Sequence, residues 1–495
     1  MAADGSRRYI AYVRETTPGT TPDNPTIQTL RVTGGDSINN ARSNITSDEI
    51  RDDRQIIISR LGQNQPEVTV PIELSFESYD EMMAGACGND WIGDYDFNPI
   101  TVDISGAVIT DSNSTDLQAL GVAPGDWVVI SNLEESSEDG VYYVQSVNIS
   151  DITLRQADRT TAAAFTSATG DEVRITGGFT GGQIDASTNT VTIDATAKTI
   201  TTATNAMWID TYRLSEGDAI FFEGFATVGN NGWHVITSIS NTDITLGNST
   251  LAVESLSSGT LNFAVSTALL TTGLTLHTYT MEEGFVDIQE YHNMSGAKIG
   301  SMSMSIQPDT IITGEFAFTG QKYVPFRNRW QTANTPGTGT SIATTRNPAN
   351  TNQVFDSYTG SLIFDGQDLG MSDDILITGI DFSLDNGVDR RFALLDRDAK
   401  SISQGRITCT GTVSAFFADG ELSDKFDEED EFEIRVRLED LDENSYLFGW
   451  PKAKFTSSTK TISETDVTES FDIAMLGGDN FYNTMYIKKQ PKAPS

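Results

Sequence analysis

Short segments of alternating apolar and polar residues recur along the whole chain, separated by Gly, Asn, Asp and Ser. Val68, Val70 and Ile72 alternate with polar neighbours, and so do Ile434 and Val436 near the other end. A period of two places every second side chain on the same face, which is typical of half-buried β-strands. The pattern therefore predicts an all-β protein.

Few segments have a helical period, and two of them stand out. The first runs from Tyr79 to Cys87, and Ser78 precedes Glu81 by three residues, which is the spacing of a capping box. The second lies around residues 421–426, with Asp419 as the expected N-cap. Each stretch follows an alternating strand, so we expect one short helix in each half of the chain.

The two predicted helices indicate that the chain is duplicated. A shift of 341 residues places Val70 on Gly411 and Ser78 on Asp419, with pleat and cap in phase. A charge-dense loop precedes each of the two strands, and a β-hairpin follows each helix. The identity between the halves is weak, so a coincidental match is the alternative.

This duplication predicts two tandem β-sandwich or barrel domains. The first consists of residues 27–99 with 269–330, and the second of residues 353–495. A Gly/Thr/Asn/Pro-rich stretch at 331–352 is interpreted as the linker between them. Residues 1–26, with three prolines, are interpreted as an extended N-terminal arm.

A second repeat lies inside the first half. Gly125-Asp126 and Gly217-Asp218 are 92 residues apart, and the same offset separates Asp151–Leu154 from Asp243–Leu246. One constant offset without gaps predicts two copies of a small β module, each made of short strands joined by tight turns.

These two modules are expected at residues 100–178 and 183–268. The segment Gly-Gly-Phe-Thr-Gly-Gly at 177–182 is interpreted as a hinge between them. They separate the helix at 79–87 from its hairpin, so we expect an insertion at an exposed loop tip that projects from the outer surface.

Charge is the most unusual bulk property, because 70 Asp and Glu residues against 32 Lys and Arg give a net charge of −38. Such a surface repels phosphate, so the chain is a poor candidate for a protein that grips DNA. The excess either only keeps the protein soluble or forms a surface past which nucleic acid moves without being held. Composition is compatible with both.

Recognisable catalytic or metal-binding spacing is missing from the sequence. His234, His277 and His292 have no partner at ligand spacing, and Cys87 and Cys409 are expected to be buried free thiols. We expect no enzyme activity, no cofactor and no metal. No apolar run approaches the roughly 18 residues of a membrane helix, and the first residues lack a secretory signal, so we expect cytoplasmic synthesis without membrane insertion.

Several stretches, in their order along the chain, resemble the tail tube proteins of long-tailed phages. The resemblance covers nearly everything except residues 100–268. The stretches are Glu15–Pro22, Ile45–Arg54, Tyr79–Met83, Thr280–Ile288, Thr313–Phe318, Asp381–Asn386, Gly405–Gly411 and Phe416–Asp419.

The resemblance implies a structural subunit of a non-contractile (siphovirus) tail, polymerising as stacked rings into a hollow tube for DNA ejection. Family rings are sixfold or pseudo-sixfold, so two halves per chain imply trimeric rings, or hexameric rings if the duplication is illusory. The implied partners are a tape measure protein and double-stranded DNA in the lumen, without specific binding, and tail terminator and distal tail proteins. The implied location is the virion tail, after assembly in the host cytoplasm.

The charge-dense loops at 42–60 and 385–400 are our candidates for contacts between rings. Mixed signs can complement a neighbour and set register, although an exposed solvated loop is the alternative. The candidate residues are Asp48, Glu49, Arg51, Asp52, Asp53, Arg54, Asp389, Arg390, Arg391 and Arg397.

A surface adhesin or fibre protein with sugar-binding β repeats is the main alternative function. It would explain the repeats and the acidity, but not the charge-dense loops. A carbohydrate-active enzyme ranks third, because no catalytic constellation is recognisable.

Overall fold

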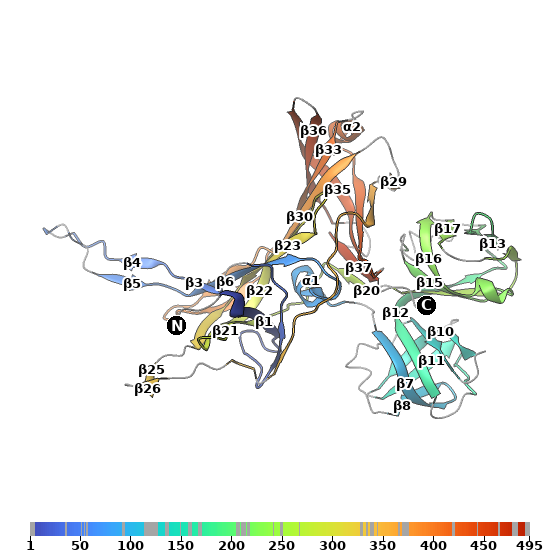
Figure 1. The fold of residues 1–495 in the computed structure, drawn as a ribbon, viewed down its shortest axis with the longest axis horizontal. Helices are drawn as coiled ribbons and strands as arrows, with labels where there is room; N and C mark the ends of the chain where they lie inside the picture. Colours follow the sequence, from blue (N-terminus) through green and yellow to red (C-terminus); the bar gives the residue numbers. More distant parts are fainter. Residues whose placement is uncertain are drawn as a thin grey trace. The chain divides into compact units, whose positions relative to one another are not determined.

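The chain folds almost entirely into β-strands, which confirms the predicted all-β class (Figure 1). Within the described residues the α-helices are α1 (Asp80–Cys87) and α2 (Glu421–Asp427), and neither is long and apolar enough to cross a membrane. The computed structural model describes residues 5–490 apart from 35–36, 51, 54, 56–57, 92–94, 113–126, 134–137, 149, 157–160, 167–170, 204–207, 209–213, 215–217, 241, 248–250, 267, 327–329, 333–334, 337–340, 344, 365–366, 369–375, 418–420, 443, 464–465 and 478–483.

The strands form two compact units, which are described separately. Unit 1 consists of Met1–Asp90, Leu270–Asp442 and Tyr446–Ile487. Unit 2 consists of Trp91–Leu269 with two short pieces, Glu443–Ser445 and Lys488–Ser495.

Unit 1 contains one series of elements twice. The first series is β1 (Arg8–Arg14), β2 (Thr26–Thr29), β3 (Asn39–Ala41), β4 (Asn44–Thr46), β5 (Ser59–Leu61), β6 (Gln65–Glu73), α1, β21 (Tyr279–Phe285), β22 (Glu290–Ile306), β23 (Thr313–Thr319) and β24 (Lys322–Phe326). The second is β28 (Gly360–Phe364), β29 (Gln367–Asp368), β30 (Ile377–Asp385), β31 (Asp389–Phe392), β32 (Ala399–Ser403), β33 (Thr408–Phe416), α2, β34 (Phe432–Glu439), β35 (Ser445–Ile462), β36 (Val467–Met475) and β37 (Tyr486–Gln490).

The two series also pair their strands in the same way. In the first, β1 pairs with β2 and β21, β6 with β3 and β23, and β22 with β23 and β24. In the second, β28 pairs with β29 and β34, β33 with β30 and β36, and β35 with β36 and β37. This repeated topology agrees with the predicted duplication. Outside the series lie β20 (Ala268–Thr271), β25 (Trp330–Thr332), β26 (Thr335–Pro336) and β27 (Thr345–Asn347).

The register of the strands corrects the predicted offset by two residues. The strands β22 and β35 carry bulges at matching places, and counting from them aligns Phe316 with Phe471. Phe316 pairs with Val70 and Phe471 with Val413, so Val70 corresponds to Val413 rather than to Gly411. A shift of two leaves every side chain on the same face of its strand, which is why the pleat still agreed.

The core of unit 1 follows the predicted period of two. Val68, Val70 and Ile72 of β6 are each at most 2% exposed, and Ile434 and Val436 of β34 are also buried. Full burial of such a side chain stabilises the fold by about 1.5–3 kcal/mol. The alternating pattern therefore marks true core positions.

Both cysteines are buried free thiols, as predicted. The Cys409 sulfur lies 3.3 Å from the Met475 sulfur, and burial raises the pKa of the Cys409 thiol to about 12. A buried thiol that stays protonated is a poor nucleophile and a poor metal ligand.

The predicted capping box of α1 is wrong. The N-cap is Tyr79, without a side-chain cap hydrogen bond. The Ser78 hydroxyl is instead bonded within the preceding turn, to Ser75 Oγ at 2.7 Å and to the Phe76 carbonyl at 3.4 Å. The helix ends at Gly88 in the left-handed conformation (φ 66°), which glycine tolerates best. Asp419, the expected cap of α2, lies outside the described residues.

In the described part of unit 2, the strands form a 13-stranded sheet. Its strands are β7 (Tyr95–Ser105), β8 (Val108–Asp111), β9 (Trp127–Ser131), β10 (Gly140–Val147), β11 (Asp151–Gln156), β12 (Asp171–Asp185), β13 (Val191–Asp194), β14 (Thr199–Thr202), β15 (Ala219–Glu223), β16 (Gly232–Ile239), β17 (Asp243–Leu246), β18 (Glu254–Leu256) and β19 (Thr260–Ser266).

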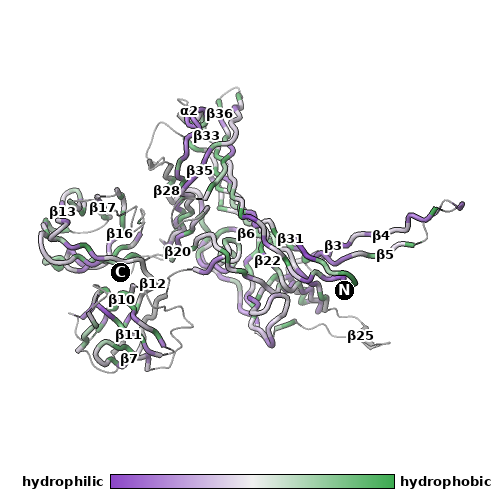
Figure 2. The backbone as a smooth tube through the Cα atoms, turned by 180° about the vertical axis from the view of Figure 1, so that it is seen from behind, coloured by the Kyte–Doolittle hydropathy of each residue, from purple (hydrophilic) through white to green (hydrophobic). Residues whose placement is uncertain are grey.

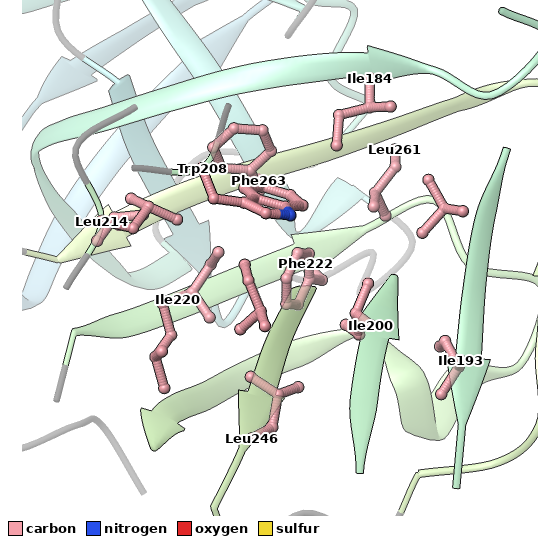
Figure 3. Packing of buried hydrophobic residues seen from close by; sticks show 14 of the residues in the cluster. Ile184, Ile193, Ile200, Trp208, Leu214, Ile220, Phe222, Leu246, Leu261 and Phe263 are labelled. Carbon is pink, nitrogen blue, oxygen red and sulfur yellow. The ribbon is translucent and has the colours of Figure 1, made fainter. Parts of the chain in front are cut away.

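The stretches related by 92 residues fold alike. β9, β10 and β11 begin 92 residues before β15, β16 and β17. The first three pair in the order β9–β10–β11 and the second three in the order β15–β16–β17, with bulges after Val144 and Ile236. Each stretch buries its own apolar cluster, and Trp208, Phe222 and Phe263 lie together in the second one (Figure 3). Gly125, Asp126 and Gly217 of the repeat motif lie outside the described residues.

The segment at 177–182, predicted as a hinge between the modules, lies in the continuous strand β12 where the strand passes from one module to the other. This strand pairs first with β7 and β9 and then, from Thr180 onwards, with β19. A Cβ atom at Gly181 would lie 2.5 Å from the Trp127 side chain. The glycine therefore allows close packing rather than bending.

Candidate functional site: an acidic sheet face and its open edges

One continuous sheet of unit 1 runs through β6, β23, β22, β30, β33 and β36, and its two faces differ sharply. Val70, Met302 and Phe382 point to the buried face. The opposite face carries cross-strand rows of small polar and acidic residues. One row is Pro71, Glu315, Ser303, Ser383, Thr410 and Ala474, and the next is Glu73, Thr313, Ser305, Asp381, Thr412 and Asp472.

This second face, called the acidic face below, has no cation in those two rows. Four of the twelve positions are Asp or Glu, and a third row beside them ends with Asp385 and Thr408. Asp472 accepts hydrogen bonds from Thr412 Oγ1 at 3.2 Å and from Ser457 Oγ at 2.6 Å. Asp472 is thus held by neutral hydroxyl groups, and Asp381 accepts from the Gln307 amide at 3.3 Å. The charge of these carboxylates is not cancelled by ion pairs within the two rows.

The acidic face is also hollowed. A depression of about 840 Å³ is lined by residues of both rows, among them Ser303, Glu315, Asp381 and Thr412. Most of the residues that line the depression are Ser, Thr, Gly or Ala, whose short side chains leave the space open. Such a surface offers carboxylates and hydroxyl groups to whatever passes it, but few groups that bind phosphate.

The sheet ends at two edges. At one end lies β3, which is paired with β6. At the other end lies the second half of β35, whose residues Ala453–Ile462 are paired with β36 on one side, while Thr459 and Ile462 are exposed. Backbone groups at such edges can pair with a strand of another chain.

The first candidate loop is a projecting hairpin formed by β4 and β5 (Figure 1). Hydrophobic and hydrophilic positions lie side by side along it (Figure 2). At its end Ile50 is 98% exposed. The candidates Asp48, Glu49, Asp52 and Asp53 are exposed there, whereas Arg51 and Arg54 lie outside the described residues.

The second candidate loop is the shorter hairpin β31–β32, and one of its residues is already used within the chain. Arg390 donates from Nε to the Gly320 carbonyl at 2.9 Å and from Nη2 to the Pro66 carbonyl at 2.5 Å. Burial lowers the pKa of this guanidinium. The side chain of Arg390 therefore fixes the root of the hairpin, while Asp389, Arg391 and Arg397 are exposed.

The sequence identified the two charge-dense loops, which the structure shows to be β-hairpins, but missed the acidic face. The signal was present, because Thr69, Pro71 and Glu73 alternate with the buried residues of β6. It could not be recognised, since strands from both halves have to be aligned before the rows appear. In the described part of the chain, no group of three His, Cys, Asp or Glu residues has the arrangement of a metal site.

Comparison with known families identifies both halves of the chain. The model of a family described as phage tail tube protein matches residues 5–251 and again residues 247–475. No curated protein matches the chain at a significant level. The two matches agree with the predicted fold class of tandem tail-tube-type regions. Their common boundary at 247–251 lies within unit 2, so the second match also includes β21–β24 of the first series.

Proposed function

The chain belongs to the phage tail tube protein family, as its two family matches show, and we propose that it polymerises as stacked rings into a hollow tube that conducts genomic DNA into the host cell. The family is one of structural proteins, not of enzymes. Our proposal concerns how this particular chain would close a ring and what its lumen would present to DNA.

The observation that carries the proposal is the junction between the two series of unit 1. Here β22 of the first series pairs antiparallel with β30 of the second, from Ser301–Asp385 to Ile306–Ile380. The equivalent of β22 is β35, and the equivalent of β30 is β3. These equivalents are the two edges of the sheet, so the same junction can form between neighbouring chains.

The internal junction also supplies the register of the junction between chains. Ser303 pairs with Ser383 inside the chain. Ser303 and Thr459 lie equally far beyond the bulges of β22 and β35. Ser383 pairs with Thr410, and Asn39 pairs with Glu67, which is the equivalent of Thr410 in the first series. Asn39 is therefore the equivalent of Ser383. In this proposal Thr459 therefore pairs with Asn39 of the neighbouring copy, and both side chains extend the acidic face.

Equal junctions, combined with the sixfold or pseudo-sixfold rings of the family, imply a ring of three chains. Each chain contributes one internal junction and one junction to its neighbour, so three chains give six similar junctions with pseudo-sixfold symmetry. A head-to-tail contact repeated by rotation closes such a ring, and contacts between rings build the filament. A ring of six chains is the alternative, and it would follow if the two series did not act as equivalent tube domains.

The acidic face would then line the lumen. Its rows of hydroxyl groups and carboxylates offer DNA phosphates no cation, so DNA would slide rather than bind. This use of the acidity goes beyond solubility, because the carboxylates are placed on one face together with short side chains.

The proposed domain organisation keeps the two tube domains expected from the sequence, at 27–99 with 269–330 and at 353–495, with two changes at the borders of the first. β1 (Arg8–Arg14) joins this domain through its pairing with β2 and β21, and β7, which begins at Tyr95, belongs to unit 2. The modules at 100–178 and 183–268 would decorate the outside of the tube. We further propose a siphovirus tail as the location, after assembly in the host cytoplasm. The tape measure protein and DNA would occupy the lumen, and tail terminator and distal tail proteins the ends.

An adhesin or fibre protein is the less favoured function. It would account for the modules of unit 2, but not for the duplicated tube domains. Negative-stain imaging of the purified protein separates the possibilities. We expect stacked rings with a central hole, whereas single globules or solid fibres would contradict the proposal.

A further inference from the structure

A cationic groove in unit 1 is unusual in a chain with so many carboxylates. It has a volume of about 910 Å³ and lies between α1 and the root of the hairpin β31–β32. Lys298, Arg391 and Arg406 line it, together with exposed Leu274 and Leu276. The groove thus combines three cations with an apolar surface.

These three cations have no acidic partner among the described residues. Lys298 is buried and donates to the Ile402 carbonyl at 2.7 Å. Burial and the nearby Arg391 both lower the pKa of this amine. Like charges kept together in an acidic protein indicate a site for an anion that comes from outside the chain.

The duplication offers an internal comparison. The equivalent of Lys298 in the second series is Lys454, which forms an ion pair with Glu429 at 2.7 Å. The lysine at this position therefore has an acidic partner from its own chain in the second series, whereas in the first series it has none among the described residues.

We propose that the groove receives the acidic end of the β4–β5 hairpin of another copy. The sequence of this end has four acids, Asp48, Glu49, Asp52 and Asp53, against two arginines, so the end is acidic on balance. It also exposes the side chain of Ile50, which suits a groove with both cations and leucines. The other acidic run, at 427–431, is already paired with Lys452 and Lys454. Nine residues from 42 to 50 in an extended strand reach about 30 Å, so the hairpin end can lie well away from its root at β3.

The inference rests on the proposed tube, and crosslinking tests it directly. In the variant Ile50→Cys with Leu274→Cys, oxidation of assembled tubes should give a ladder of covalently linked chains on a denaturing gel. The matched control is Ile50→Cys with Leu441→Cys, because Leu441 is 74% exposed in the same unit but lies outside the groove. Intact tubes without a ladder, or an equal ladder in the control, would overturn the inference.

Charge exchange supplies the second test. Arg391→Glu, or Asp52→Lys with Asp53→Lys, should reduce the fraction of protein sedimenting as tubes about tenfold or more while rings remain. Combining the groove and hairpin changes should restore part of the loss. Lys198→Glu in unit 2 is the control with the same change of charge. If these variants assemble like the wild type, the docking of the hairpin in the groove is overturned while the proposed function stands. If the wild type itself forms no rings or tubes, the proposed function is overturned and the docking with it.

Discussion

At the residue scale, alternation decides which side chains are buried, and it can be read from the sequence. Val70 and Ile434 were assigned to the core from their pattern alone, and both are buried. Local hydrogen bonds and glycine packing could not be read in this way. Ser78 has the spacing of a cap but bonds to Ser75, and Gly181 lies in a strand at a place where a Cβ atom would clash with Trp127.

Glu223 in unit 2 provides a test at this scale. Its carboxylate accepts a hydrogen bond from the Val141 amide at 3.2 Å, and burial raises its pKa. The protonated Glu223 carboxyl therefore contributes to the stability of unit 2 at low pH. This contribution is lost as the pH rises through the raised pKa of the carboxyl.

Glu223→Gln should remove this loss, because glutamine does not ionise and can still accept from the Val141 amide. We expect unit 2 of the variant to be more stable at pH 7, by about 0.5–1 kcal/mol, and unchanged at pH 4. Denaturant unfolding at the two pH values measures this. Lower stability at pH 7 would show that the charged carboxylate is needed.

At the element scale, the two hairpins and the two sheet edges carry the assembly proposal. The sequence located the hairpins through their charge, because charge is visible in a single stretch. The edges could not be predicted, since whether β3 or β35 lies at an edge depends on every other pairing of the sheet.

The register between chains can be tested at the β3–β35 edge. Thr459→Cys with Asn39→Cys places two thiols on directly opposed residues, about 5 Å apart at Cβ. Oxidation should link chains in a closed circle, so the ladder on a denaturing gel should stop at three chains. The control Thr459→Cys with Ser47→Cys should give no closed species. Failure of the first pair to link in intact rings would contradict the register.

The first hairpin is open to a simpler test. Reversal of Asp48 and Glu49 to Lys should block polymerisation while leaving a folded protomer, because the attraction between the hairpin end and the cations of the next ring would become repulsive. Sedimentation and circular dichroism check the two parts. Tubes of normal length from this variant would refute the assignment of the hairpin.

At the scale of the whole molecule, the duplication determines the stoichiometry and the acidic face determines what the lumen does. The all-β class and the tandem organisation followed from the sequence, because pleat and helix positions repeat along it. The offset was in error by two residues, since β6 and β33 tolerate that shift without exchanging faces.

The lumen assignment predicts an effect on DNA passage. Ser303→Lys with Thr412→Lys would place two cations on the acidic face, which would attract phosphates and slow genome ejection. The matched control adds lysine outside the face, at Val228 and Val253, which are exposed in unit 2. Ejection rates measured on phages with each tube compare the two. Equal rates would contradict the assignment of this face to the lumen.

The central claim is that one chain supplies two equivalent positions of the ring. A cryo-EM reconstruction of the assembled tube tests it most directly. We predict three chains per ring, with six similar tube domains and alternating internal and intermolecular junctions of the same β register. Six whole chains per ring would contradict the claim.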